Sequence, residues 1–199
     1  MLGKTHLVIG ETAALAVLQP SGWREVALCL GAAAVGSVIC DIDAENSHAR
    51  KNVNRMILVS IFALVVLGIA EWKLDLGIAQ KIMEERDLFV RAAGLVGFLV
   101  MCIIGKRQPH RGFMHSVLAT VIFSGLVYVM LPKAAYYFAV AMSSHLVLDL
   151  FNKKNLSLWF PFPGGVSLKI CKADGWTNQT LFYIGCAAMV VLTLIALFR

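Results

Sequence analysis

Long apolar stretches are the feature that most restricts the fold of this chain. About seven follow one another, and most approach the roughly 20 helical residues needed to cross ~30 Å of hydrocarbon. They cover residues 5–19, 23–41, 54–71, 88–105, 113–131, 134–151 and 179–198. Hydrophobic residues make up 59% of the 199 residues, and the mean hydropathy is +0.76. A soluble core of ordinary composition is therefore excluded.

The spanning elements must be helices, because unpaired backbone groups are too costly in lipid and no ten-residue alternating pattern indicates a barrel. We predict an all-α, polytopic transmembrane bundle of about six to seven helices, forming a single integral membrane domain over residues 1–199. The first stretch is short and contains Glu11, which leaves open whether it crosses the membrane fully.

Positive charge predicts the orientation of the chain. With seven crossings, eleven Lys and Arg residues fall on the side of the N-terminus and six on the other side, with Arg91 inside a span. The eleven are Lys4, Arg50, Lys51, Arg55, Lys106, Arg107, Arg111, Lys153, Lys154, Lys169 and Lys172. The N-terminal side is predicted to be cytoplasmic, in the inner (plasma) membrane. The net charge of +6 then indicates a surface that faces membrane lipids, not nucleic acid.

Two segments between the stretches are predicted to lie at the membrane interface. Residues 74–86 have Leu74, Ile78 and Ile82 at helical spacing among charges, which is typical of an amphipathic helix on the outer surface. Residues 157–166 contain two prolines, two glycines and the aromatic residues Trp159, Phe160 and Phe162. This composition predicts a cytoplasmic loop that dips into the headgroup region.

Seven imidazole and carboxylate residues lie where apolar stretches begin or end. They are His6, Asp41, Asp43, His110, His115, His145 and Asp149. The predicted topology brings all of these ends to one face, so we expect the seven side chains to gather at the cytoplasmic interface. Each pair alone also fits an ordinary buried hydrogen bond or a basic loop. Together they favour a metal site.

The spacing within the motifs supports this interpretation. His145 and Asp149 are four residues apart and share one helical face. Asp41 and Asp43 are two apart, which a helix would splay, whereas a frayed or extended end would aim both at one cation. Imidazoles with hard carboxylates suit Zn²⁺, Mn²⁺ or Fe²⁺. We expect zinc or manganese, and seven ligands fit two ions better than one tetrahedral zinc.

The motifs resemble those of the YdjM-like family of membrane-bound metal-dependent hydrolases. The resemblance rests on THLVIG (5–10), CDID (40–43), HRGFMHS (110–116), SSHLVLDLF (143–151) and LWFPF (158–162), in this order over nearly the whole chain. The His/Asp set is also similar in pattern to that of zinc-dependent phospholipases C. The resemblance implies a metal-dependent hydrolase of the plasma membrane in which the seven residues form the metal set.

We therefore expect a hydrolase that acts on a phosphoester or other ester of a lipid, by attack of a metal-activated water. Arg111, with Lys153 or Lys154, would hold the anionic group of the lipid-like substrate, and Asp43 or a non-ligating histidine would transfer the proton. The alternative is a metal-ion or proton transporter that uses the intramembrane His and Asp residues. A third interpretation is a scaffold whose metal only holds helices together.

Overall fold

The computed structural model describes residues 2–44, 85–172 and 175–199, together with isolated positions between 50 and 73. The described part is all-α, with six α-helices and two short 3-10 turns. The elements are α1 (Gly3–Leu18), α2 (Gly22–Val38), η1 (Ile39–Asp43), α5 (Arg86–Gly105), η2 (Phe113–His115), α6 (Val117–Met130), α7 (Pro132–Leu150) and α8 (Trp176–Phe198). The predicted stretch 54–71 and the predicted interfacial helix 74–86 lie largely outside the described residues.

Three described helices are long and apolar enough to cross a membrane. They are Gly22–Asp43, where η1 continues α2, Arg86–Gly105 and Trp176–Phe198. Helix α1 has 16 residues and α6 has 14, so both are shorter than a full crossing. Helix α7 has 19 residues but carries Ser143, Ser144, His145 and Asp149, which lower its hydropathy. Helices α1 and α6 are thus shorter than the three candidate spans, and α7 is more polar than they are.

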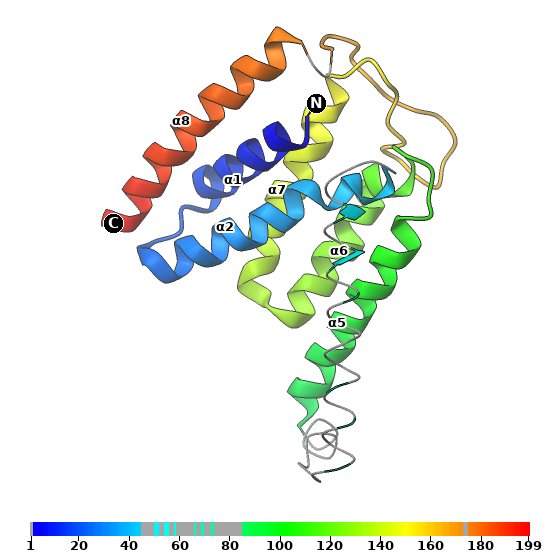
Figure 1. Cartoon of the computed structure of the whole chain (residues 1–199), viewed down its shortest axis with the longest axis vertical. Coiled ribbons are helices and arrows are strands. Elements are labelled where there is room, and N and C mark those ends of the chain that lie inside the picture. Colours follow the sequence, from blue (N-terminus) through cyan, green and yellow to red (C-terminus); the bar gives the residue numbers. More distant parts are fainter. Residues whose placement is uncertain are drawn as a thin grey trace.

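Helix α7 lies between its neighbours and holds the polar residues away from the surface. It packs against α1, α2 and α6, and Figure 1 shows α1 and α2 crossing it on one side. Two glycines let these helices approach closely. A Cβ on Gly10 of α1 would lie 2.5 Å from the Ser37 side chain of α2, and one on Gly36 would lie 2.5 Å from the Phe138 carbonyl of α7.

The main core lies among α2, α5, α6 and α7, and it is formed by aromatic and aliphatic side chains. Phe98 of α5 contacts Phe123 of α6 and Phe138 of α7 edge to face, with ring centroids 5.4 and 6.3 Å apart. Phe123 and Phe138 are fully buried. Helix α8 differs, since only Asn178, Gly185 and Ala196 are buried in it and most of its exposed side chains are apolar. Such a helix needs a lipid or protein environment around it.

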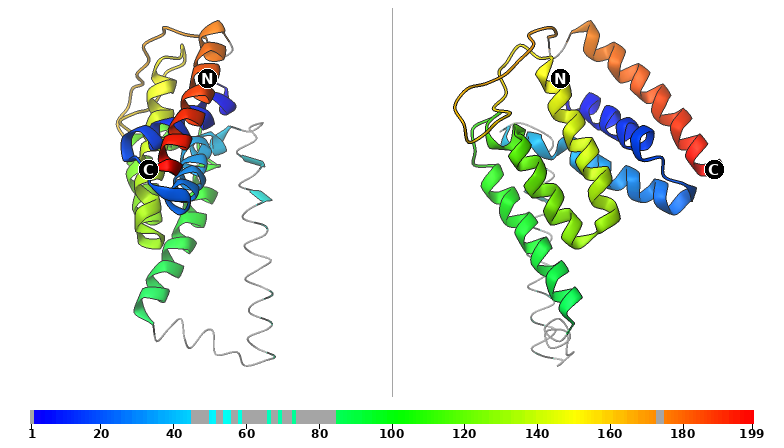
Figure 2. Two further views of the ribbon diagram at one scale, coloured as in Figure 1. Left: turned by 90° about the vertical axis from the view of Figure 1, so that its left-hand side faces the viewer. Right: turned by 180° about the vertical axis from the view of Figure 1, so that it is seen from behind.

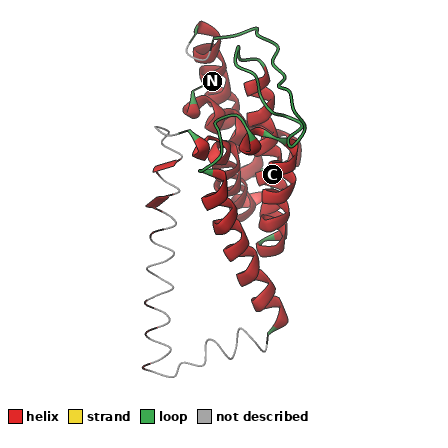
Figure 3. Cartoon of the chain, turned by 90° about the vertical axis from the view of Figure 1, so that its right-hand side faces the viewer, coloured by secondary structure: helices red, strands yellow, loops and turns green. Residues whose placement is uncertain are grey.

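The long loops gather at one end of the bundle. Residues 106–116 and 151–172 form most of this end, and the N-terminus lies near it (Figures 2 and 3). The loop after α7 is tied down by isolated bridges, Asn152 with Cys171 and Leu156 with Val166. The predicted dip of residues 157–166 is a loop without regular helix, and Trp159 and Phe162 are exposed in it.

Candidate metal centre

All seven predicted ligands come together at the end of the bundle where the loops lie. His6 is in the first turns of α1, Asp41 and Asp43 are in η1, and His145 and Asp149 are in the last turns of α7. His110 precedes η2 and His115 ends it. Five of them are buried, Asp41 is partly buried and the His110 side chain is 41% exposed. The cluster is therefore internal, with one histidine at its edge.

Two carboxylate oxygens and two imidazole nitrogens lie close to one another at the centre of the cluster. Asp41 Oδ1 lies 3.7 Å from both His115 Nε2 and His145 Nε2. Asp149 Oδ2 lies 3.5 Å from His115 Nε2 and 3.9 Å from His145 Nε2. Tetrahedral bonds of ~2.0–2.2 Å place ligand atoms roughly 3.3–3.6 Å apart. These four carboxylate–imidazole separations equal or slightly exceed those expected around a tetrahedral zinc ion.

The Nε2 atoms of the two central imidazoles have no hydrogen-bond partner among the described residues. His145 Nδ1 lies 2.6 Å from the Ser37 carbonyl, so this nitrogen carries the proton and donates it. The lone pair of His145 Nε2 then points toward the two carboxylates. Both His145 Nε2 and His115 Nε2 are buried without a hydrogen bond, which is costly unless another group satisfies them. A divalent cation fits this donor set, since neutral imidazole and carboxylate are its usual ligands.

His6 and Asn152 complete the surroundings of Asp149. His6 Nε2 lies 3.3 Å from Asp149 Oδ1, and the His6 ring stacks on the His145 ring with centroids 3.8 Å apart. Asn152 donates a hydrogen bond of 2.6 Å to the same Oδ1. His6, His145 and Asp149 have ligand atoms within 4.8 Å of one another and form a second group able to hold an ion.

Asp43 lies on the other side of His115 and connects three neighbours. Its Oδ1 accepts a hydrogen bond of 2.8 Å from His110 Nδ1, and its Oδ2 accepts one of 3.1 Å from the Arg111 backbone N–H. His115 Nδ1 lies 3.3 Å from the same Oδ2. Burial lowers the pKa of His115, which lies in η2, but Asp41 and Asp43 outweigh burial and raise it to about 9. Two carboxylates thus lie on opposite sides of this ring.

Asp43, His110 and His115 form the third group that could hold an ion. Because His115 is shared with the central group, the groups overlap, and the expected number of ions stays a prediction. The contact between Asp43 and His115 Nδ1 is also the arrangement by which a carboxylate orients a metal-binding imidazole. The structure therefore offers Asp43 two roles, as a ligand or as the partner that orients His115.

The backbone before α6 places His110, Arg111 and His115. Arg111 has a positive φ of 67°, which is uncommon for a residue with a side chain and occurs where the surroundings impose it. The turn continues with Gly112 N–H donating to the Pro109 carbonyl and His115 N–H to the Gly112 carbonyl. Ser116 then caps α6 by accepting from the Ala119 N–H. These bonds fix the direction of His115.

The two predicted anion-binding residues, Arg111 and Lys153, differ in their distance from the cluster and in their exposure. The Arg111 Nη2 lies 3.3 Å from Asp149 Oδ2, and its Nη1 donates a hydrogen bond of 2.7 Å to the Lys154 carbonyl. Its Nε is buried without a hydrogen bond. Lys153 is exposed on the loop after α7. Arg111 thus belongs to the cluster, whereas the structure leaves Lys153 at the surface.

Two residues of the cluster escaped prediction from the sequence. Ser37 contributes only its backbone carbonyl to His145, and any residue type carries that group. Asn152 donates a hydrogen bond to Asp149, three residues before it in the chain. This i, i+3 spacing is the sequence feature from which the contact could have been predicted. Both contacts depend on how α2, α7 and the following loop pack.

Comparison with known proteins identifies the family of this chain. The family model for the YdjM inner membrane protein matches residues 1–199. The chain belongs to the YdjM inner membrane protein family. It is therefore an inner membrane protein with three candidate spans among its described residues and a buried His/Asp cluster able to bind metal. Neither a curated protein nor a solved structure matches it.

Proposed function

We propose that this YdjM family protein is a metal-dependent hydrolase that acts on a phosphoester or other ester of a lipid at the inner leaflet. The observation that supports the proposal most is the central group of the cluster. There, the buried and unpartnered Nε2 atoms of His115 and His145 face the Asp41 and Asp149 carboxylates. Such a dry, preformed set of ligands is costly to fold without a cation.

His115, His145, Asp41 and Asp149 would hold the metal, with His6 beside them. Bound zinc or manganese supplies Lewis acidity to a water molecule and to the ester oxygen. The His145 Nδ1–H bond to the Ser37 carbonyl fixes the tautomer that ligation requires. The group formed by Asp43, His110 and His115 could hold a second ion, as in the two-ion chemistry of many phosphoester hydrolases. Asp43 and His110 would then be ligands, whereas with one ion they are free to transfer a proton.

Arg111 would stabilise negative charge on the substrate during the reaction. Its guanidinium is held by Asp149 and by the Lys154 carbonyl, while Nε remains unpartnered, so a rigid donor is available. Asp43 with His110 would carry the proton, because His110 is partly exposed and hydrogen-bonded to the buried carboxylate. Lys153, exposed on the nearby loop, would attract the anionic headgroup.

The loop after α7 supports a lipid substrate. The Ser157 N–H donates to the Arg111 carbonyl, which ties this loop to the cluster. Trp159 and Phe162 of the same loop are exposed, as expected for side chains that enter the headgroup region. A lipid headgroup could therefore approach the cluster while its acyl chains stay in the bilayer.

The decisive experiment measures metal, activity and folding in His145→Ala. The wild-type chain, purified in mild detergent, is expected to retain zinc or manganese by elemental analysis and to hydrolyse phospholipid in mixed micelles. His145→Ala is expected to lose both, since it removes a central ligand. Ser144→Ala is the control, because this neighbouring residue on α7 bonds only the Ala141 carbonyl.

The proposal fails if wild-type protein retains no divalent metal, or if His145→Ala hydrolyses lipid as well as wild type. Flux of metal or protons across vesicles that depends on His145, without hydrolysis, would identify a transporter. If wild type shows neither hydrolysis nor flux and His145→Ala only lowers the melting temperature, the protein is a scaffold.

A further inference from the structure

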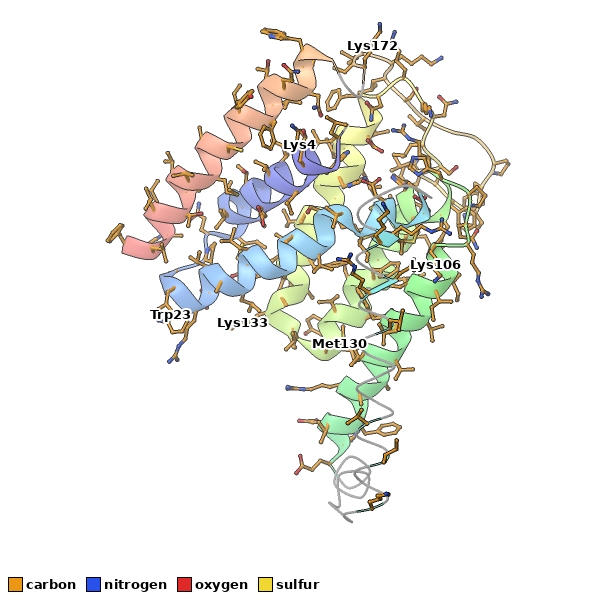
Figure 4. The ribbon with its side chains drawn as sticks, viewed as in Figure 1. Lys4, Trp23, Lys106, Met130, Lys133 and Lys172 are labelled. Atoms are coloured by element: carbon orange, nitrogen blue, oxygen red, sulfur yellow. The ribbon has the colours of Figure 1, made fainter. Side chains whose placement is uncertain are left out.

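A cavity of about 530 Å³ lies beside the metal centre, on the side of η1 and the end of α5. Three cationic side chains line it, Arg50, Lys106 and Arg107, and Asp43 and His110 form the wall toward the cluster. Figure 4 shows Lys106 where α5 ends. The volume falls in the usual range for a small-molecule site, roughly 300–1,000 Å³.

Cationic side chains outnumber acidic ones among the described residues that line the cavity. Asp43 is the one acidic residue among the described residues that line it, and both of its oxygens are already engaged by His110 and the Arg111 N–H. Lys106 Nζ donates to the neutral Asn54 side chain at 3.2 Å, so this contact leaves its charge uncompensated. Cations grouped around a hollow attract an anionic ligand.

We propose that this cavity binds the phosphate group of the substrate, which narrows the proposed lipid ester to a phosphate ester. The inference rests on the proposed function, because the shared wall of Asp43 and His110 is what would bring the phosphate to the metal centre. Planar arginine donors match phosphate oxygens in pairs. An uncharged acyl ester would gain nothing from the charges of Lys106 and Arg107.

Inorganic phosphate is the first probe. Binding to the full, metal-loaded chain in detergent is measured by calorimetry, and the comparison of variants that keep their metal separates the contribution of the cavity from that of the metal. The double variant Lys106→Gln with Arg107→Gln is expected to weaken binding by roughly a hundredfold, about tenfold for each lost charged donor. Lys169→Gln with Lys172→Gln is the control, because these residues carry the same charge at this end of the molecule but do not line the cavity.

A second arm separates a lipid-borne phosphate from a free one. Metal-loaded protein is assayed on mixed micelles of phosphatidic acid and on a water-soluble phosphomonoester, with a neutral acyl ester, diacylglycerol, as the comparison. We expect the Lys106/Arg107 variant to lose turnover on the phosphate esters while its activity on diacylglycerol, if present, stays unchanged. Preference for the micellar substrate would identify the lipid headgroup as the ligand.

The inference is overturned if the Lys106/Arg107 variant and the Lys169/Lys172 control bind phosphate equally, or if only diacylglycerol is cleaved. That failure is distinct from failure of the proposed function, which is decided by metal content and by His145→Ala. A chain that keeps its metal and hydrolyses acyl ester would retain the hydrolase proposal and lose this one.

Discussion

Asp43 shows how one side chain at the edge of the cluster bears on the whole site. It faces His115 Nδ1 at 3.3 Å, while the opposite nitrogen of that ring faces Asp41 and Asp149. A carboxylate in this position sets the ring direction and increases the basicity of the far nitrogen. It also holds the Arg111 backbone in its positive-φ conformation through the bond to the Arg111 N–H.

Asp43→Asn tests this positioning role. An amide keeps the size of the side chain but loses the charge that orients His115, so metal affinity is expected to fall roughly 10- to 100-fold. Competition with a chelator of known affinity measures the change. Asn155→Ala is a suitable control, since Asn155 lies exposed on the loop after α7. If Asp43 is itself a ligand of the second ion, the same variant will instead reduce the number of bound ions, which elemental analysis detects.

At the scale of elements, close approach of α1, α2 and α7 is what places His6 beside His145. Gly36 is the tightest point, because a Cβ there would meet the Phe138 backbone carbonyl at 2.5 Å. Backbone cannot move aside as a flexible side chain can. Gly31, five residues earlier on the same helix, has open space where its Cβ would be, so the two glycines differ in environment and not in secondary structure.

Gly36→Ala is therefore expected to destabilise the protein by about 1–3 kcal/mol, as overpacking does, and to weaken metal binding by separating α2 from α7. Gly31→Ala should be neutral or slightly stabilising, since alanine is the better helix former. Thermal unfolding in detergent, followed by circular dichroism, compares the two. Equal melting temperatures would show that the α2–α7 contact tolerates expansion.

The sequence predicted the helical stretches well where apolar length alone determines them. The expected stretches 88–105 and 179–198 correspond to α5 (Arg86–Gly105) and α8 (Trp176–Phe198). Grouping of the seven His and Asp side chains also followed from their positions at stretch ends. The 3-10 turn that directs Asp41 and Asp43, and the positive φ of Arg111, depend on tertiary hydrogen bonds. No local pattern in the sequence encodes those bonds.

At the scale of the whole molecule, several lysines lie at the same end as the candidate metal centre. Figure 4 places Lys4, Lys106 and Lys172 toward the end with the loops and Lys133 toward the opposite end. Lys133 is paired there with Glu25, with Nζ 3.1 Å from Oε1, so its charge is compensated. Because Lys4, Lys106 and Lys172 lie at the end that holds the candidate metal centre, we predict from the positive-inside rule that this end faces the cytoplasm.

Cysteine labelling in intact cells tests this orientation. Lys133→Cys is expected to react with a membrane-impermeant maleimide added outside, and Lys172→Cys only after the inner membrane is opened, because impermeant reagents reach one face alone. The unmodified chain is the control, since four of its five cysteines are buried and Cys186 is partly buried. The reverse pattern would put the cluster on the outer face and exclude an inner-leaflet substrate. Labelling of both positions from outside would show that α7, which lies between them in the chain, does not connect the two faces.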